Sequence, residues 1–123
     1  MRNQDPYEHL RLMYKYARTL NSLIEDGELT RESLGRSQLI QAGTVKFLEL
    51  IGEEAWQLTK ADIDLGPDIP LLQIANMRHR MVHAYEGVNW SVVEEAAFED
   101  VPQLIVSIQE ICASRSIHLD PRD

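Results

Sequence analysis

The chain has 123 residues, a formal net charge of −8 and one cysteine. This length fits one domain with its own core, and a lone cysteine excludes an internal disulfide or a cysteine-based zinc cluster. No apolar run is long enough to cross a bilayer, and the polar residues 1–5 lead into no signal-type segment, so we expect a cytoplasmic protein. The acidic balance argues against a broad basic surface for nucleic acid, so any phosphate-binding footprint must be local.

The first predicted helix opens at Asp5, as N-cap, and Pro6, at the first helical position. Apolar residues then recur every three or four positions to about residue 25: Leu10, Met13, Tyr14, Ala17, Leu20 and Ile24. Asp26 and Gly27 end this helix. Thr30, with serine and glutamate close behind it, suits the start of a short helical turn.

A longer helix is predicted from about residue 36 to residue 59, with an apolar stripe through most of its length. Gly43 and Gly52 lower its helix propensity but would let another helix approach closely. Residues 60–69 contain glycine, proline and three aspartates, and we expect a surface connection. These aspartates lack the glycine and distal glutamate of a calcium loop, so we predict no metal site there.

The third helix is predicted to begin at Pro70 and to break after residue 84, which leaves Tyr85 in the exit turn. A fourth starts at Asn89 or Ser91, the latter in a capping box with Glu94. Pro102 removes a helical hydrogen bond, so we expect a kink or break near residue 100. The apolar stripe then continues to about residue 114, includes Cys112 as a buried residue, and leaves 116–123 as a frayed tail.

Together these patterns predict one all-α domain over residues 1–123. Four amphipathic helices joined by short loops are typical of an up-and-down four-helix bundle, here with a kinked or split last helix.

Residues 76–85 concentrate two arginines, two histidines and a tyrosine in this acidic chain. Arg78 carries a planar fork of donors suited to phosphate, and His83 can exchange a proton near neutral pH. Such a pair can cleave a phosphodiester without a metal, because one group manages the proton and the other neutralises charge on the phosphoryl oxygens. Five residues turn about 140° on a straight helix, so the two side chains converge only if the helix ends there or a second subunit contributes.

An alternative interpretation of this stretch needs no catalysis. Arg78, His79 and Arg80 also suit the last turn of a helix, where cations complement the negative end of the helix dipole. His83 would then be a histidine whose hydrogen bonds are satisfied at the helix C-terminus.

Two landmarks resemble the HepT-like toxins of the HEPN superfamily. Arg78, His83 and Tyr85 match the family motif Arg, four to six residues, His, any residue, Tyr. Upstream, residues 51–55 (Ile-Gly-Glu-Glu-Ala) are similar to the family's Ile-Gly-Glu-Ala segment. The resemblance implies an HEPN-like bundle that forms a homodimer, with the two motifs facing a shared cleft, and no cofactor. His79 departs from the pattern, which more often has asparagine there.

The resemblance also implies what single residues do. Arg78 and His83 would be catalytic in a metal-independent endoribonuclease that cleaves RNA, with His79 and Tyr85 positioning the phosphate. Glu53 would orient the arginine or the histidine, although a solvated helix face explains it equally well. A minimal nucleotidyltransferase would be the antitoxin of this type VII toxin–antitoxin pair. It would silence the toxin by transferring AMP to Tyr85, since added phosphates repel RNA.

Two other functions stay open at this point. The chain is alternatively a non-catalytic dimeric scaffold that binds the nucleotidyltransferase, or a nucleotide-binding partner of that enzyme. Exposure separates the ribonuclease from the scaffold, because a catalytic cleft needs both Arg78 and His83 exposed and within reach of one phosphate. Burial of either residue in a salt bridge would favour the scaffold.

Overall fold

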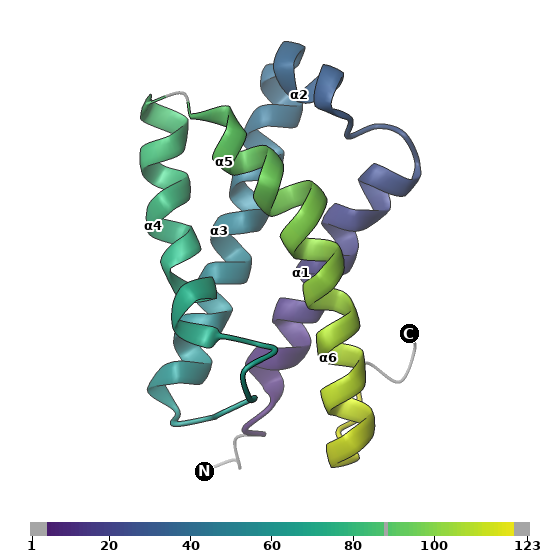
Figure 1. The fold of residues 1–123 in the computed structure, drawn as a ribbon, viewed down its shortest axis with the longest axis vertical. Coiled ribbons are helices and arrows are strands. Elements are labelled where there is room, and N and C mark those ends of the chain that lie inside the picture. The colour runs from purple at the N-terminus through teal and green to yellow at the C-terminus, as the bar shows by residue number, and fades with distance from the viewer. Residues whose placement is uncertain (1–4, 88, 120–123) are drawn as a thin grey trace.

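The computed structural model describes residues 5–87 and 89–119, without the side chains of residues 83–87. All regular structure in these residues is helical, as predicted (Figure 1). The segments are α1 (Glu8–Glu25), α2 (Arg31–Arg36), α3 (Gln38–Lys60), α4 (Leu71–Gly87), α5 (Trp90–Glu95), the π-helical turn η1 (Ala96–Asp100) and α6 (Val101–Arg115).

Four long rods make up the bundle, and they alternate in direction (Figure 1). The helices α1, α3 and α4 are three of them, and α5, η1 and α6 join into the fourth. The central rod is α3, which packs against both α1 and α4, while α1 also contacts α6 and α4 contacts α5. The predicted up-and-down four-helix bundle is therefore confirmed. Among the described residues, no helix combines the length and apolarity that a membrane span requires.

The core forms where the predicted apolar stripes meet. Its largest fully buried side chains come from all four rods and two connections: Leu10, Met13, Leu20, Leu29, Leu34, Leu48, Ile51, Leu58, Leu65, Ile69, Met81 and Ile108. Each such side chain contributes about 1.5–3 kcal/mol on burial. Cys112 is also buried, at 4% exposure, as predicted.

The helix starts agree only in part with the capping predictions. Thr30 and Ser33 form a reciprocal capping box at the start of α2, as predicted. The first helix begins at Glu8 rather than at Pro6, and the Asp5 carboxylate accepts a hydrogen bond from the Tyr7 N–H (2.9 Å). Of the two starts predicted for the fourth helix, Asn89 occupies the N-cap position, although its side chain makes no capping bond. The alternative capping box at Ser91 is wrong, because α5 already includes Trp90.

The kink predicted near residue 100 takes the form of a widened turn. Pro102 lacks an N–H and its ring crowds the carbonyl four residues earlier. The chain relieves this crowding with η1, where Val101 N–H pairs with the Ala96 carbonyl, five residues back. The rod therefore bends without breaking, and Pro102 falls in the first turn of α6, where a missing donor costs least.

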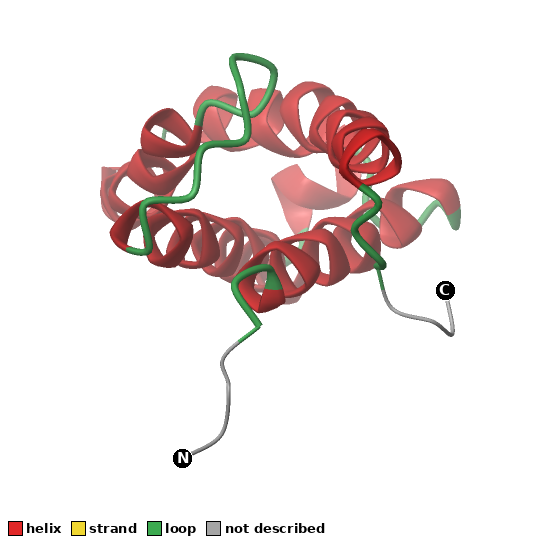
Figure 2. Cartoon of the chain, turned by 90° about the horizontal axis from the view of Figure 1, so that it is seen from below, coloured by secondary structure: helices red, strands yellow, loops and turns green. Residues whose placement is uncertain are grey.

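The connection between α3 and α4 is more than a surface loop. Figure 2 shows it crossing the lower end of the bundle. Leu65 and Ile69 point into the core and are 2% and 1% exposed. The predicted surface connection is correct for most of residues 60–69, but Leu65 and Ile69 among the aspartates close this end of the core.

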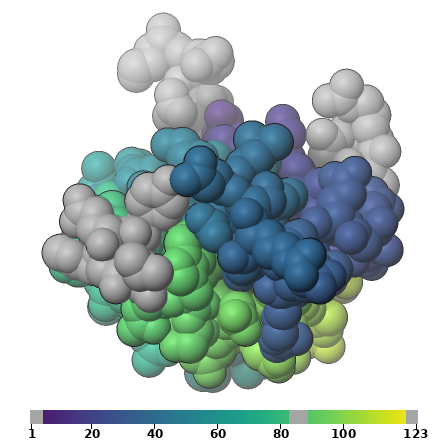
Figure 3. Space-filling view, turned by 90° about the horizontal axis from the view of Figure 1, so that it is seen from above, coloured from purple at the N-terminus to yellow at the C-terminus, as the bar shows by residue number. Residues whose placement is uncertain are grey.

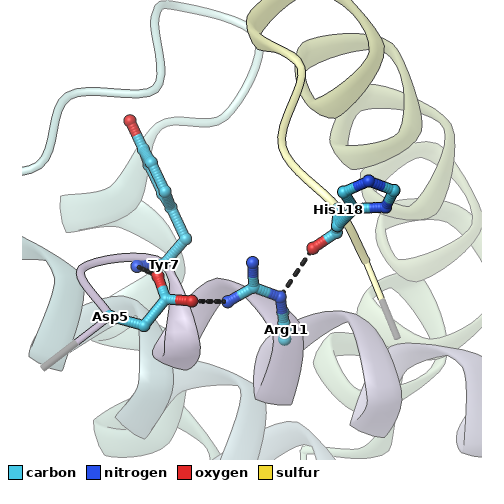
Figure 4. Close-up of polar contacts among 4 residues, drawn as sticks. All are labelled: Asp5, Tyr7, Arg11 and His118. Carbon is cyan, nitrogen blue, oxygen red and sulfur yellow. Dashed lines mark hydrogen bonds and ion pairs between the residues drawn. The ribbon is translucent and has the colours of Figure 1, made fainter. Parts of the chain in front are cut away.

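The frayed tail predicted from residue 116 is also wrong for residues 116–119. The side chains of Ile117 and Leu119 pack against the core, and Ile117 N–H bonds to the Cys112 carbonyl. Arg11 lies between the two ends of the chain (Figure 4). Its guanidinium donates to the His118 carbonyl and to the Asp5 carboxylate, at 2.6 Å each. Residues 120–123 lie outside the described residues.

At the upper end, α2 and the start of α3 lie beside α5 (Figure 3). Arg31 holds this contact together, since its guanidinium pairs with Glu94 and Glu99 at 3.3 and 3.5 Å and lies over the ring of Phe98. Leu39 stands out on the same end, because 82% of it is exposed to solvent.

Candidate active site

Arg78 lies midway along α4, on the side that faces α3. Pro70 precedes the helix, and its carbonyl accepts the Ile74 N–H, the first bond of the opening turn. Leu71, Ala75, Met77 and Met81 turn to the interior and fix the rotation of the helix about its axis. The helices α3 and α4 run side by side in opposite directions (Figure 1).

Gly52 sets how closely these two helices approach. A Cβ atom at this position would lie 2.8 Å from the Arg78 backbone nitrogen and 3.1 Å from both the Arg78 Cβ and the Ile74 carbonyl oxygen. Such distances are too short for a side chain, so only glycine fits without a shift of backbone. The prediction of a close helix approach is correct for Gly52, whereas no described atom lies within 4 Å of a Cβ at Gly43.

The close approach brings Glu53 onto Arg78. One carboxylate oxygen, Oε1, accepts from Arg78 Nη1 at 2.6 Å, and the other, Oε2, accepts from Gln57 Nε2 at 2.8 Å. Glu53 therefore pairs with Arg78 and does not lie on a purely solvated helix face. The two side chains are 41% and 40% exposed, so the pair lies at the surface.

The electrostatics of this pair keep Glu53 charged. The hydrogen bond from Gln57, and then that from Arg78, hold the pKa of the Glu53 carboxyl below its ordinary value of 4.5. A carboxylate fixed at one edge of the guanidinium orients its plane. The solvent-exposed part of the fork keeps donors with which to bind an anion.

Trp56 completes the surroundings of the arginine. The Arg78 Cζ atom lies 5.2 Å from the centre of the indole ring, a cation–π contact. Sequence reasoning missed Trp56 and Gln57 as site residues. Their separation of three and four residues from Glu53 was a usable signal, because such positions share one helix face.

The neighbouring basic residues point elsewhere. His79 is exposed, on the next position around the helix. Arg80 lines a separate groove of about 290 Å³ between α4 and the η1–α6 rod, together with Asp100. Burial raises the pKa of the Asp100 carboxyl, and the charge of Arg80 opposes that rise. Arg78 and Arg80 therefore do not form one basic patch.

The side chains of His83 and Tyr85 lie outside the described residues. The backbone of α4, however, continues through Gly87. The prediction that Tyr85 sits in the exit turn is wrong, because this residue belongs to the last helical turn. We expected Arg78 and His83 to converge only if the helix ended there or a second subunit contributed. Because α4 continues past His83, the first of these two conditions is not met.

Glu54, the residue next to Glu53, serves a different helix. Its carboxylate is almost buried and contacts His9 Nδ1 on α1 at 2.5 Å. The neighbouring glutamates of α3 thus face opposite partners, and only Glu53 belongs to the site of Arg78.

Comparisons with known proteins agree with the landmarks of the sequence. A family model described as "Ribonuclease HepT-like" matches residues 13–111. A candidate RNase of Caldanaerobacter subterraneus subsp. tengcongensis is 30% identical over 80 residues, which cover 65% of this chain and 71% of that protein. A candidate RNase of Methanocaldococcus jannaschii is 25% identical over 100 residues, 80% of this chain and 83% of that protein.

A third relative carries a more specific name. The "Probable ribonuclease HepT" of Thermococcus cleftensis is 36% identical over 64 residues, which cover 52% of this chain and 58% of that protein. No solved structure matches the chain.

Proposed function

Because this chain belongs to the HepT-like ribonuclease family of the HEPN superfamily, we propose that it is a metal-independent endoribonuclease, the toxin of a toxin–antitoxin pair. One observation carries the proposal. The motif arginine, Arg78, is presented to solvent at 40% exposure with its guanidinium held by Glu53. At this exposure the guanidinium can be reached by a phosphate from solvent.

In the proposed reaction an RNA 2′-oxygen attacks the adjacent phosphorus and the 5′-oxygen leaves. His83 moves the proton, taking it from the 2′-hydroxyl or giving it to the leaving oxygen. Arg78 stabilises the charge that builds on the phosphoryl oxygens, and Tyr85 and His79 position the phosphate. Glu53 contributes as a positioning residue, since it touches Arg78 rather than the reacting atoms.

A homodimer would bring these groups together. Arg78 and His83 are about 140° apart around a continuous helix, so a phosphate on one subunit cannot readily touch both. In a homodimer whose second subunit faces α4, Arg78 of one subunit and His83 of the other would contact the same phosphate.

The proposed antitoxin is a minimal nucleotidyltransferase that transfers AMP to Tyr85. The position of Tyr85 supports this, because it lies two residues before the end of α4. Phosphates added there, two helical turns from Arg78, would compete with RNA for the guanidinium.

A second candidate function rests on the acidity of the chain. With a net charge of −8, the surface repels RNA outside the immediate site. A non-catalytic dimeric scaffold, or a nucleotide-binding partner of the nucleotidyltransferase, would tolerate that charge. The exposure of Arg78 favours the ribonuclease over the scaffold, whereas a nucleotide-binding partner would use the same residues and bind ATP or AMP without cleaving RNA.

Cleavage of a mixed RNA pool in excess chelator tests the proposal. The wild type should cut, whereas His83→Ala and Arg78→Ala should each lose about a hundredfold or more in rate. Arg36→Ala is the matched control, because Arg36 is an exposed arginine, at 78%, paired only loosely with Glu32. Equal rates for all four proteins, or no cleavage by the wild type, would overturn the ribonuclease and leave the scaffold.

A further inference from the structure

We propose that Trp56 and Arg78 together form a stacking platform for a nucleobase that flanks the scissile phosphate, and that this platform favours purines. The inference rests on the proposed function, because it places a substrate base beside the catalytic arginine. The proposed subsite includes a residue of α3, whereas the motif residues Arg78, His83 and Tyr85 all lie on α4.

The platform is already assembled without a ligand. The Arg78 Cζ atom lies 5.2 Å from the centre of the indole ring of Trp56. The ring is partly buried and packs against the core, so its plane is fixed. The guanidinium is fixed separately, by the 2.6 Å bond to Glu53. Two flat groups with limited freedom lose little entropy when a third flat group joins them.

The ion pair alone does not explain the tryptophan. Glu53 and its Gln57 neighbour hold Arg78 through hydrogen bonds that do not involve the ring. The indole instead backs the guanidinium, which lies over the ring, and 40% of the Arg78 side chain remains exposed to solvent. RNA-binding sites use this combination, in which bases stack on aromatic rings and on guanidinium planes.

The geometry of α3 places the platform beside the phosphate site. Trp56 and Gln57 follow Glu53 by three and four residues, so these side chains share the face that borders α4. A phosphate bound by the outer donors of Arg78 has its adjoining nucleoside within reach of the indole. Purines present a larger flat area to the paired guanidinium and indole than pyrimidines do, so they should bind more tightly.

Tryptophan fluorescence tests the platform without any need for cleavage. The chain has two tryptophans, so Trp90→Phe leaves Trp56 as the sole emitter. Titration with 3′-AMP or 3′-GMP should quench this emission, and 3′-CMP and 3′-UMP should require concentrations about fivefold higher or more. Ribose 5-phosphate, which has no base, should leave the emission unchanged.

The reciprocal variant is the matched control. Trp56→Phe retains Trp90 alone, and its emission should not respond to the same nucleotides. Absence of quenching in Trp90→Phe, or quenching by ribose 5-phosphate equal to that by the nucleotides, would overturn the platform.

Cleavage kinetics supply the second test. With a purine beside the cut, Trp56→Leu should raise KM about fivefold or more with little change in kcat, and Trp56→Phe should retain most of the binding. Far-ultraviolet circular dichroism checks that each variant is folded. Wild-type cleavage with an unchanged KM in Trp56→Leu refutes the platform and leaves the ribonuclease intact. Quenching by purines without any cleavage refutes the ribonuclease and leaves the platform intact.

Discussion

The backbone nitrogen of Arg78 lies 2.8 Å from the point where a side chain on Gly52 would begin. The nearest atoms belong to the backbone of α4 rather than to a flexible side chain, so they cannot yield locally. The separation of two helices, and with it the approach of Glu53 to the motif arginine, therefore depends on one missing methyl group.

We expect Gly52→Ala to destabilise the fold by about 1–3 kcal/mol, because the added methyl group must push α4 away from α3. The same variant should lose ribonuclease activity through displacement of Arg78. Gly43→Ala is the control on the same helix. No described atom lies within 4 Å of the new methyl group there, so the higher helix propensity of alanine should stabilise by about 0.5–1 kcal/mol. Urea unfolding measures both changes, and equal effects would show that helix contact is not the cause.

Acid should weaken the Glu53 contacts selectively. Gln57 and then Arg78 hold the pKa of Glu53 below 4.5 in the folded protein. The stabilisation by the charged carboxylate is therefore fully present at pH values above 4.5, the ordinary pKa. It is lost as the pH falls through the lower pKa that Glu53 has in the folded protein. Because both side chains are about two-fifths exposed, solvent screens the pair and limits its contribution to under about 1 kcal/mol.

Urea unfolding of wild type and Glu53→Gln checks this pH dependence. The difference in unfolding free energy should be present at about pH 7 and should shrink as the pH falls below the ordinary carboxyl value of 4.5. Gln57→Ala, which removes the largest cause of the lowered pKa, should move the loss to higher pH. A difference that stays constant over this range would mean that the charge of Glu53 does not stabilise the fold.

Arg11→Ala should release both ends of the described chain. The guanidinium donates to Asp5 near the start and to the His118 carbonyl near the end. Limited proteolysis should then cut near residues 116–119 faster than in the wild type, with a loss of global stability of about 1 kcal/mol. Arg115→Ala is a useful comparison, since Arg115 donates to the Asp64 carbonyl instead. Unchanged proteolysis in Arg11→Ala would show that apolar packing of Ile117 holds the end by itself.

The Cys112 thiol should be unreactive in the native protein. It is 4% exposed, and burial raises its pKa, so little of the nucleophilic thiolate forms. A disulfide-forming dye should label it only after addition of concentrated guanidinium chloride. Rapid labelling of the native protein would indicate frequent local opening of α6.

Local patterns were enough to predict much of this fold. The apolar stripes gave the four rods because residues three and four apart share a helix face. Pro102 indicated the bend, since proline within an apolar helical stripe removes a hydrogen bond and crowds the preceding turn. Gly52 indicated a close approach for a similar reason, although the sequence did not distinguish it from Gly43.

Other features depend on partners far away along the chain. Leu65 and Ile69 lie in a segment with loop composition, and only the open end of the bundle explains their burial. The contacts of Arg78 with Glu53 and Trp56, and of His9 with Glu54, join different helices. Hydrophobic periodicity predicts which side of a helix turns inward, but it does not identify the opposing residue. The arginine could be found from its motif, whereas its orientation required the packed structure.

Three consecutive residues of α3 each face a different neighbour: Gly52 the backbone of α4, Glu53 the guanidinium of Arg78, and Glu54 the imidazole of His9. Each residue of a helix is rotated by about 100° from the one before. An insertion or deletion of one residue here would shift the carboxylates past their partners. After a deletion of one residue, Glu54 could take the place of Glu53 beside Arg78, but it would then no longer contact His9. The length of this part of the chain is therefore as constrained as the identity of Gly52.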